Sequence, residues 1–311
     1  SEGNDVVAAI QEAINIGEQA KMPVEISHFK ISAKALWGET PMTLGLIRSA
    51  RERGLTVTVD QYAYPASSTS LDVRLPNWAV AGGREEGKKR LADPETRKKI
   101  IEEMKQDLKK KDFKDYSFAY VANFSANPEF NGKNIADITQ IVKGKKKLEA
   151  QIEQIFDMYE KGGASMVYQV MSEEDVKTIM KEPFTMIASD SSVRQFGSGV
   201  PHPRGYGNNA RVLGRYVREL KVVTLEDAVR KMTSLPAQTF GLRDRGQIRE
   251  GFAADIVIFD ETKVTDKATF EAPHQYAQGF SFVIVNGEVV FDGAKMTGTM
   301  PGQPLRGAGG R

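Results

Sequence analysis

The side chains best suited to chemistry are a histidine and an aspartate that end two short apolar segments. His28 ends the alternating run Pro23-Val-Glu-Ile-Ser-His28, and Asp190 ends Phe184-Thr-Met-Ile-Ala-Ser-Asp190. A neutral imidazole can bind zinc, and a carboxylate can both touch the metal and take a proton from metal-bound water. The metal lowers the pKa of that water toward neutrality, which lets hydroxide attack an amide carbonyl. This pair therefore suits metal-assisted hydrolysis.

Metal ligands of other kinds are scarce in this chain. It has no cysteine and three histidines, His28, His202 and His274, so thiolate sites and disulfides are excluded within these residues. Any metal site must draw on carboxylates, on an unusual ligand or on groups beyond this chain. Each candidate also has an ordinary interpretation, His28 as a hydrogen-bonded structural or surface residue and Asp190 as the cap of a turn.

The predicted elements that position these residues alternate between strands and helices. Strands are predicted at Pro23–His28, Leu55–Tyr62, Ala164–Val170 and Phe184–Asp190. A helix from Thr40 to Arg53 links the first two strands, and such a strand–helix–strand unit implies parallel pairing. Four repeats make half of an eightfold barrel, in which ligands and catalytic residues sit at the C-terminal ends of the strands. That rule selects His28, the segment from Asp60 to Tyr64, the end of the Tyr168–Met171 strand, and Asp190 with the loop that follows it.

Two other segments depart from this rhythm. Residues 72–150 are rich in lysine, with an amphipathic helix over Pro94–Lys110 and an aromatic strand-like piece at Tyr116–Phe124. We interpret them as an insertion whose lysine runs are solvated faces. From Gly246 onward, alternating strands flank the turn Asn286-Gly287. The predicted fold is α/β: a partial TIM-like (β/α) barrel of about the last four strands, in residues 1–71 and 151–245, an inserted α+β segment in 72–150, and a small β-sandwich module in 246–311.

Composition narrows the function classes. The net charge is +2, with 43 basic and 41 acidic residues, so nothing indicates a nucleic-acid partner. No apolar run approaches the roughly 20 residues of a membrane span, and no basic-then-apolar leader opens the sequence. We therefore expect a soluble protein, whose compartment, cytoplasmic or periplasmic, the absence of cysteine leaves open.

Several motifs carry a family resemblance that spans nearly the whole chain. They are Ile26-Ser-His-Phe-Lys30 with Trp37-Gly38, Asp60-Gln-Tyr-Ala-Tyr-Pro-Ala-Ser-Ser-Thr69, Ile187-Ala-Ser-Asp190, Pro201-His-Pro-Arg-Gly-Tyr206, Arg211-Val-Leu-Gly-Arg-Tyr216, Met232-Thr-Ser-Leu-Pro-Ala237, and Gly246-Gln-Ile-Arg-Glu-Gly251 with Ala254-Asp255. In this order they resemble the C-terminal part of the N-acyl-D-amino-acid deacylases, or D-aminoacylases, of the amidohydrolase superfamily. The Gly246 to Asp255 tail resembles the superfamily more widely.

The resemblance implies a role for each matching residue. His28 matches a metal-binding histidine at the end of the fifth barrel strand. Asp190 matches the eighth-strand aspartate, which binds metal and acts as general base and then as general acid. Arg204 matches the arginine that pairs with the α-carboxylate of the substrate, a bidentate contact that suits a planar guanidinium. His202 is expected to shape the same substrate-binding loop. The implied cofactor is zinc, as one or two ions.

Two departures from the family pattern stand out. Tyr62 occupies a position where relatives place a histidine ligand, so it is a candidate metal ligand only as a phenolate, and otherwise a hydrogen-bonding neighbour of the site. The His-x-His pair of the first strand and a bridging cysteine of the family would lie upstream of Ser1. The resemblance therefore implies a fragment that alone is poorly active, whose missing N-terminal half is in another chain or upstream, and oligomers remain open.

Three functions remain open at this point. The first is hydrolysis of N-acyl-D-amino acids to a carboxylate and a D-amino acid. The second keeps the superfamily but acts on a cyclic amide, as dihydropyrimidinases and hydantoinases do; the Pro-His-Pro-Arg204 segment argues against it, because a carboxylate-binding arginine suits open-chain acylamino acids. The third is a non-catalytic scaffold derived from the fold, which Tyr62 and the scarcity of histidine favour.

Overall fold

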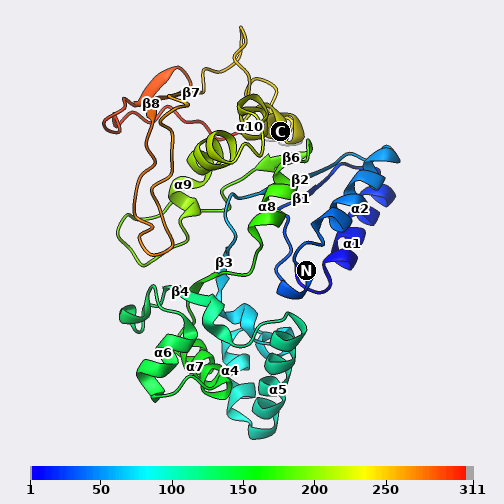
Figure 1. The fold of residues 1–311 in the computed structure, drawn as a ribbon, viewed down its shortest axis with the longest axis vertical. Coiled ribbons are helices and arrows are strands. Elements are labelled where there is room, and N and C mark those ends of the chain that lie inside the picture. Colours follow the sequence, from blue (N-terminus) through cyan, green and yellow to red (C-terminus); the bar gives the residue numbers. More distant parts are fainter. Residues whose placement is uncertain (1, 306–311) are drawn as a thin grey trace.

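The computed structural model describes residues 2–305 of the chain. Figure 1 shows three tiers along the long axis: the C-terminal sheet with its helices, a central α/β layer, and a mostly helical unit at the far end. In the described residues the strands form three sheets, with the orders β1-β2-β6, β3-β5-β4 and β7-β8-β9. No helix among these residues has the length and apolar character needed to cross a membrane.

The central layer is a parallel sheet that carries both candidate residues. Its strands are β1 (Val24–Ile26), β2 (Val57–Gln61) and β6 (Thr185–Ile187), and β2 pairs in parallel with both neighbours. His28 follows β1 by two residues and Asp190 follows β6 by three. Because parallel strands end at the same edge of a sheet, the order β1-β2-β6 places the two residues at one end of the layer.

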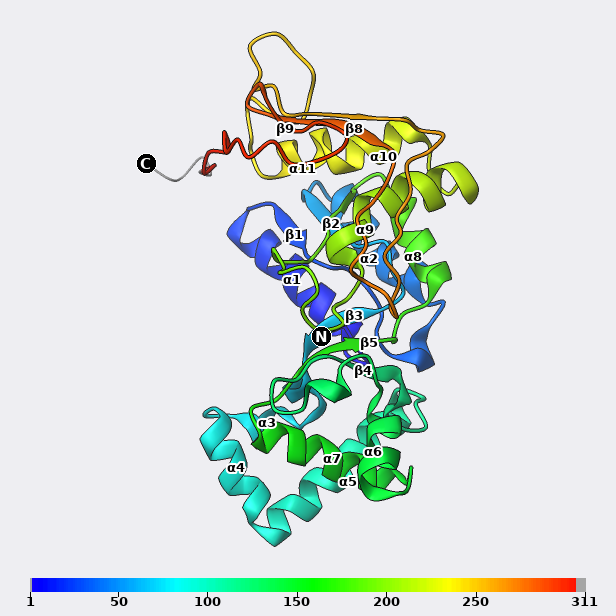
Figure 2. The ribbon, with the colours of Figure 1, turned by 90° about the vertical axis from the view of Figure 1, so that its left-hand side faces the viewer.

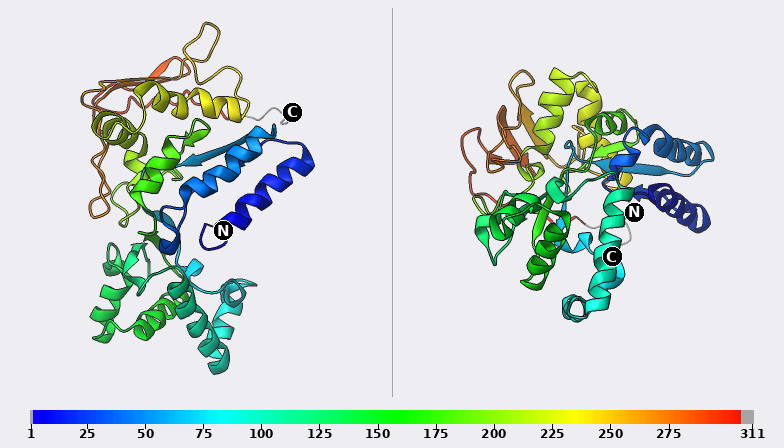
Figure 3. Two further views of the ribbon diagram at one scale, coloured as in Figure 1. Left: turned by 45° about the vertical axis from the view of Figure 1, so that its right-hand side comes forward. Right: turned by 60° about the horizontal axis from the view of Figure 1, so that its bottom comes forward.

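Amphipathic helices bury one face of this sheet. They are α1 (Val6–Ala20), α2 (Thr40–Glu52) and α8 (Glu173–Met180), and Figure 3 shows α1 and α2 side by side. Val6, Ile10 and Ile14 recur at helical spacing on α1 and are buried in one cluster with Val57 and Val59 of β2. Helix α8 begins where the Ser172 side chain accepts a hydrogen bond from the Asp175 N–H.

The inserted unit is built on an antiparallel sheet beneath the ends of the parallel strands (Figure 2). Its elements are β3 (Ser67–Ser70), the 3-10 turn Leu71–Arg74, α3 (Asn77–Val80), α4 (Arg84–Ala92), α5 (Pro94–Lys110), the 3-10 turn Tyr116–Phe118, β4 (Ala119–Asn123), the 3-10 turn Pro128–Phe130, α6 (Ile135–Lys143), α7 (Leu148–Glu160) and β5 (Ser165–Tyr168). Helix α5 has the bounds predicted from sequence, with Asp93 as its N-cap and a buried stripe of Ile100, Met104 and Leu108. The lysine-rich insertion is thus a folded unit.

One strand that was predicted for the barrel belongs to a different sheet, so that prediction is wrong. The segment Ala164–Val170 was expected to continue the parallel sheet, but its strand β5 pairs antiparallel with both β3 and β4. A short apolar strand has the same sequence pattern in either sheet, so the pattern does not identify its partners. The central sheet therefore has three parallel strands in place of four, and residues 2–305 form no closed barrel. We propose that the inserted unit extends to about residue 170.

The C-terminal tier joins helices to a small sheet. It contains α9 (Arg204–Arg211), a π-helical continuation at Val212–Glu219, α10 (Leu225–Met232), α11 (Ser234–Thr239), β7 (Ile256–Phe259), β8 (Phe280–Val285) and β9 (Glu288–Phe291). The predicted hairpin at Asn286-Gly287 is confirmed, because β8 and β9 pair antiparallel around it. The expected β-sandwich differs, since the three strands form one antiparallel sheet in the described chain.

Candidate active site

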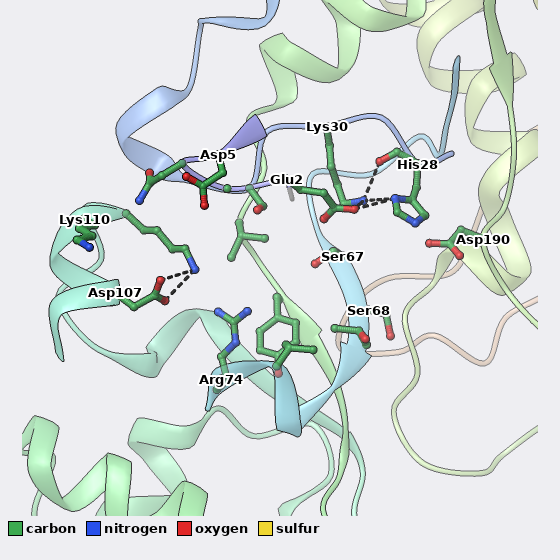
Figure 4. Close-up of a pocket in the computed structure, with 18 of the residues that line it drawn as sticks. Glu2, Asp5, His28, Lys30, Ser67, Ser68, Arg74, Asp107, Lys110 and Asp190 are labelled. Carbon is green, nitrogen blue, oxygen red and sulfur yellow. Dashed lines mark hydrogen bonds and ion pairs between the residues drawn. The ribbon is translucent and has the colours of Figure 1, made fainter. Parts of the chain in front are cut away.

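A cavity of about 880 Å³ lies where the parallel strands meet the inserted unit. Its lining comes from the segment before α1, the ends of β1 and β6, strand β3 and the C-terminal end of α5. His28, Asp190 and Tyr62 all line it. Figure 4 shows His28 and Asp190 at one end of this space and Arg74, Asp107 and Lys110 at the other. Three of the five residues selected from sequence thus line this cavity.

His28 is held in an unusual backbone conformation. Its φ is 45°, in the left-handed region that residues other than glycine rarely adopt, and its N–H donates to Asp60 Oδ1 at 2.7 Å. Its ring nitrogen Nδ1 lies 2.7 Å from Glu2 Oε1 and 3.0 Å from Lys30 Nζ. The bond to Glu2 raises the pKa of His28, although its partial burial acts in the opposite direction. Strained residues of this kind cluster at functional sites.

Asp190 has the same backbone strain and a charged partner. Its φ is 47°, and its Oδ2 lies 2.9 Å from Nη2 of Arg204. The Asp190 side chain is 40% exposed while the Arg204 side chain is 4% exposed, so the arginine is the more deeply buried partner of this ion pair. Arg204 lines a separate, smaller cavity of about 240 Å³. Nε and Nη1 of Arg204 are buried without a hydrogen-bond partner among residues 2–305.

Tyr62 is an aromatic platform beneath two cations. The Arg204 guanidinium lies 4.4 Å from the ring centroid and Lys30 Nζ lies 5.5 Å from it, both within cation–π range. The ring is 1% exposed, and its hydroxyl donates to Met171 Sδ at 3.5 Å. Burial raises the pKa of Tyr62 far above its ordinary value. A role of Tyr62 as a metal ligand, which would require the phenolate, stays a prediction.

His202 is buried and fully hydrogen-bonded. Its Nδ1 accepts from the Arg204 N–H at 3.0 Å, so its Nε2 carries the hydrogen and donates to the Ala66 carbonyl at 3.0 Å. Burial, with the nearby Arg204 charge, lowers the pKa of His202 to about 3. Both ring nitrogens are occupied by protein groups, and the side chain does not line the main cavity. His202 thus holds the backbone at the start of α9, where Arg204 lies. Its part in substrate binding stays a prediction.

The cavity wall opposite His28 carries three basic residues, Arg74, Lys110 and Lys111, to which the sequence assigned no role. Arg74 stacks on the Tyr168 ring at 4.6 Å, and its Nε is buried without a hydrogen-bond partner in residues 2–305. Lys110 and Lys111 come from the lysine run interpreted as a solvated face, yet both line the cavity. Lys111 pairs with Asp107 at 2.7 Å. Only the turn that follows β3 brings Arg74 opposite the end of α5, and this turn depends on long-range sheet pairing that the sequence pattern does not reveal.

His28 and Asp190 are side chains that bind divalent cations, but two ligands are fewer than a zinc site requires. Among the residues that the structure describes, no group of three or more histidine, aspartate and glutamate side chains is arranged to hold a metal ion. An imidazole and a carboxylate are nevertheless donors that zinc takes, and His28 and Asp190 face the same space. Since a catalytic zinc site needs about three protein ligands, the remaining ligands would have to come from outside this part of the chain.

Known proteins resemble this chain in sequence and in fold. A family model described as the amidohydrolase family matches residues 136–291. An N-acyl-D-glutamate deacylase and a D-aminoacylase of Alcaligenes xylosoxydans xylosoxydans are 33% and 34% identical to it over 98% of its length, which is 53% of theirs. A D-aminoacylase crystal structure matches with a TM-score of 0.75 and 33% identity, over 96% of this chain and 53% of that one.

A second solved structure agrees. An N-acyl-D-glutamate deacylase from Bordetella bronchiseptica, complexed with zinc and a phosphonate inhibitor, matches with a TM-score of 0.72 and 31% identity, over 94% of this chain and 53% of that one. The chain spans about half the length of these relatives. It belongs to the amidohydrolase family, within the group of D-aminoacylases and N-acyl-D-amino-acid deacylases, and matches their C-terminal portion.

Proposed function

We propose that this chain is the C-terminal half of a zinc-dependent hydrolase that cleaves the amide bond of N-acyl-D-amino acids. The products are a carboxylate and a D-amino acid. The observation that carries the proposal is that His28 and Asp190, which come from the ends of two parallel strands far apart in sequence, line one cavity. An imidazole and a carboxylate at one mouth are the groups that metal-assisted hydrolysis uses.

His28 and Asp190 have distinct parts in this proposal. His28 is a ligand through its ring nitrogen, and Asp190 is both a ligand and the group that moves protons. A bound zinc supplies Lewis acidity and an acidic water. Asp190 then takes the proton of the attacking water on its carboxylate and returns it to the nitrogen of the leaving amine. Its 40% exposed side chain is accessible to a substrate in the cavity.

Arg204 is proposed to recognise the α-carboxylate of the substrate. Two of its donor atoms, Nε and Nη1, lack a partner within residues 2–305 although the side chain is buried. Buried guanidinium donors without partners are costly, and the carboxylate of a substrate would supply an acceptor for them. The cations Arg74 and Lys110 on the opposite wall favour substrates with an acidic side chain.

The rest of the zinc site is proposed to come from a second segment of polypeptide. The relatives are about twice as long as the matched region, and two donors in this part of the chain are too few for a tight site. The second segment is either the sequence upstream of Ser1 in one protein or a separate chain. The 311 residues alone are therefore expected to hydrolyse N-acyl-D-amino acids poorly or not at all.

The test uses the whole protein, with the upstream segment present. Zinc content and turnover are measured with paired N-acetyl-D- and N-acetyl-L-amino acids. We expect zinc to be retained and kcat to fall by about 10²–10⁴-fold in Asp190→Asn, because a group that transfers protons contributes on that scale. Asp157→Asn is the matched control, since this carboxylate pairs with Lys143 in the inserted unit. Undiminished turnover in Asp190→Asn, or equal turnover of both enantiomers, would refute the proposal.

A further inference from the structure

Asn208 is a buried polar residue of helix α9 to which neither the sequence motifs nor the family resemblance assigned a role. Its side-chain oxygen accepts from the Ala63 N–H at 2.9 Å, and its side-chain nitrogen donates to the Ala188 carbonyl at 3.0 Å. Ala63 follows β2 by two residues, and Ala188 follows β6 by one. Asn208 therefore joins the ends of the two strands that lead to Tyr62 and Asp190.

The Asn208 amide takes the place of one hydrogen bond of the parallel sheet. Strands β2 and β6 pair Gln61 with Ile187, and the Ala188 N–H donates to the Gln61 carbonyl at 2.9 Å. In a regular parallel ladder, the next bond would run from the Ala63 N–H to the Ala188 carbonyl. These are the two groups that the amide joins. The strands are therefore separated at this point by the width of an amide and two hydrogen bonds in place of one.

Side chains also replace the following bond of this ladder. That bond would run from the Asp190 N–H to the Ala63 carbonyl. The Ala63 carbonyl instead accepts from Arg211 Nε at 2.8 Å and from the Tyr216 hydroxyl at 3.4 Å. Helix α9 and its π-helical continuation thus supply partners for both backbone groups of Ala63. Asp190 lies outside the ladder, and its φ of 47° differs from the extended backbone of a strand.

Packing alone does not fix the chain at the end of β6. Ser189, Arg204 and Asn208 line the cavity of about 240 Å³ beside it, so side chains leave space on this side into which the backbone between Ala188 and Asp190 could move. Hydrogen bonds from α9 must therefore hold this segment. Arg204, one turn before Asn208, contacts the Asp190 carboxylate at 2.9 Å. One helix thus holds both the backbone before Asp190 and its side chain.

We propose that Asn208 is a positioning residue that holds the ends of β2 and β6 apart and thereby directs Asp190 into the cavity. It acts through the Ala188 carbonyl, two residues before Asp190. Without the amide, the Ala63 N–H and the Ala188 carbonyl would form the ladder bond directly, and Asp190 would be drawn toward the sheet. The effect on turnover rests on the proposed function of Asp190, whereas the separation of the strand ends is a property of the chain itself.

Crystal structures of the whole protein, with the upstream segment present, test the separation. In Asn208→Ala, the Ala63 nitrogen and the Ala188 oxygen are expected to approach to about 2.9 Å, the usual length of such a bond, and the Asp190 carboxylate to move away from the cavity. Strand ends that stay as far apart as in wild type, for instance with a water in place of the amide, would overturn the proposal. If Asn208→Ala does not fold, Asn208→Ser, which keeps a polar group but not the width of the amide, carries the same expectation.

Turnover of N-acetyl-D-amino acids measures the effect on Asp190. At equal zinc content, kcat of Asn208→Ala is expected to fall about 10–100-fold, because a misplacement of about 1 Å can cost this much. KM is expected to change by less than about 3-fold, because Arg204, the proposed partner of the substrate carboxylate, keeps its bond to His202. A loss of stability alone would lower the amount of folded enzyme and leave kcat per zinc unchanged. An unchanged kcat, or a rise in KM alone, would therefore overturn the positioning role.

Asn209→Ala is the matched control for both measurements. Asn209 is the exposed next residue of α9, and its side-chain oxygen accepts from the Asn208 amide at 3.0 Å. It bonds neither Ala63 nor Ala188 in the part of the chain that the structure describes. Its substitution is expected to leave the strand ends and kcat as in wild type. A fall in kcat as large as in Asn208→Ala would show that any change in this helix slows turnover, which would refute a specific role for Asn208.

The two measurements separate this inference from the proposed function. An active wild type whose kcat is matched by Asn208→Ala would overturn the positioning role and leave the proposed function intact. A wild type that does not hydrolyse N-acetyl-D-amino acids would instead overturn the proposed function. The distance between the Ala63 nitrogen and the Ala188 oxygen in the variant crystals would still decide whether Asn208 holds the strand ends apart.

Discussion

Acid is expected to destabilise this protein through His202. The side chain is fully buried, and its ring meets those of Tyr64 and Phe270 edge-on at 5.2 Å each. Its surroundings hold it neutral, because burial and the Arg204 charge lower its pKa to about 3 from an ordinary 6.5. The unfolded chain therefore binds a proton at His202 between these two pH values while the folded chain does not. Stability must fall as the pH is lowered through this window.

The size of the effect follows from the two pKa values. Each pH unit within the window removes about 1.4 kcal/mol from the free energy of unfolding, so the loss between about pH 7 and pH 4 is about 3 kcal/mol. His202→Gln cannot take up this proton. The amide keeps a donor for the Ala66 carbonyl but loses the acceptor for the Arg204 N–H, which costs about 1–3 kcal/mol at neutral pH. The variant is therefore less stable than wild type near neutrality, and the difference disappears in acid.

Urea unfolding measures this difference. The fluorescence of Trp37 and Trp78 reports the transition, and unfolding free energies of wild type and His202→Gln are compared at several pH values between about 7 and 4. The raised pKa of His28 has the opposite effect, since its stabilisation is present in acid and is lost as pH rises through the folded value. It is common to both proteins and cancels in the difference. A stability gap that stays constant across this range would refute the reasoning.

Two further changes test the packing around the site. Asp175→Ala removes a buried carboxylate that accepts from the Thr40 hydroxyl at 2.5 Å and from the Gly38 N–H, so it is expected to lower the urea midpoint by an amount equivalent to about 2–4 kcal/mol; an unchanged midpoint would contradict a structural role. Tyr62→Phe removes only a hydroxyl bonded to Met171 Sδ, so zinc content of the whole protein is expected to stay the same, and a loss of zinc would restore Tyr62 as a ligand.

Local sequence patterns predicted the helices and strands well and the pairing of the strands less well. The stripe of Ile100, Met104 and Leu108 after an Asp93-Pro94 start defines α5, because helix signals lie within a few residues of one another. The strand β5, Ser165–Tyr168, was placed in the wrong sheet, because strand pairing is set by contacts distant in sequence. Lys110 at the end of α5 is exposed as expected, and its place on the cavity wall could not be predicted because that cavity forms only in three dimensions.

At the site, too, the sequence identified residues better than the contacts between them. His28 and Asp190 follow from the strand-end rule and the family motifs, and both line the cavity. Glu2 gave no signal in the sequence, because its contact with His28 depends on how the segment before α1 lies against the chain after β1. The motif placed His202 in the substrate-binding loop. Only the structure shows that its two ring nitrogens bind the Arg204 N–H and the Ala66 carbonyl.

The most direct test of the account is the position of the metal. A crystal of the whole protein is soaked with zinc, and the ion is located by its anomalous scattering. We predict a zinc peak within about 2.0–2.2 Å of both a ring nitrogen of His28 and a carboxylate oxygen of Asp190, the usual bond lengths for these donors. A well-occupied zinc bound elsewhere, with these two side chains on different ions or on none, would contradict the account.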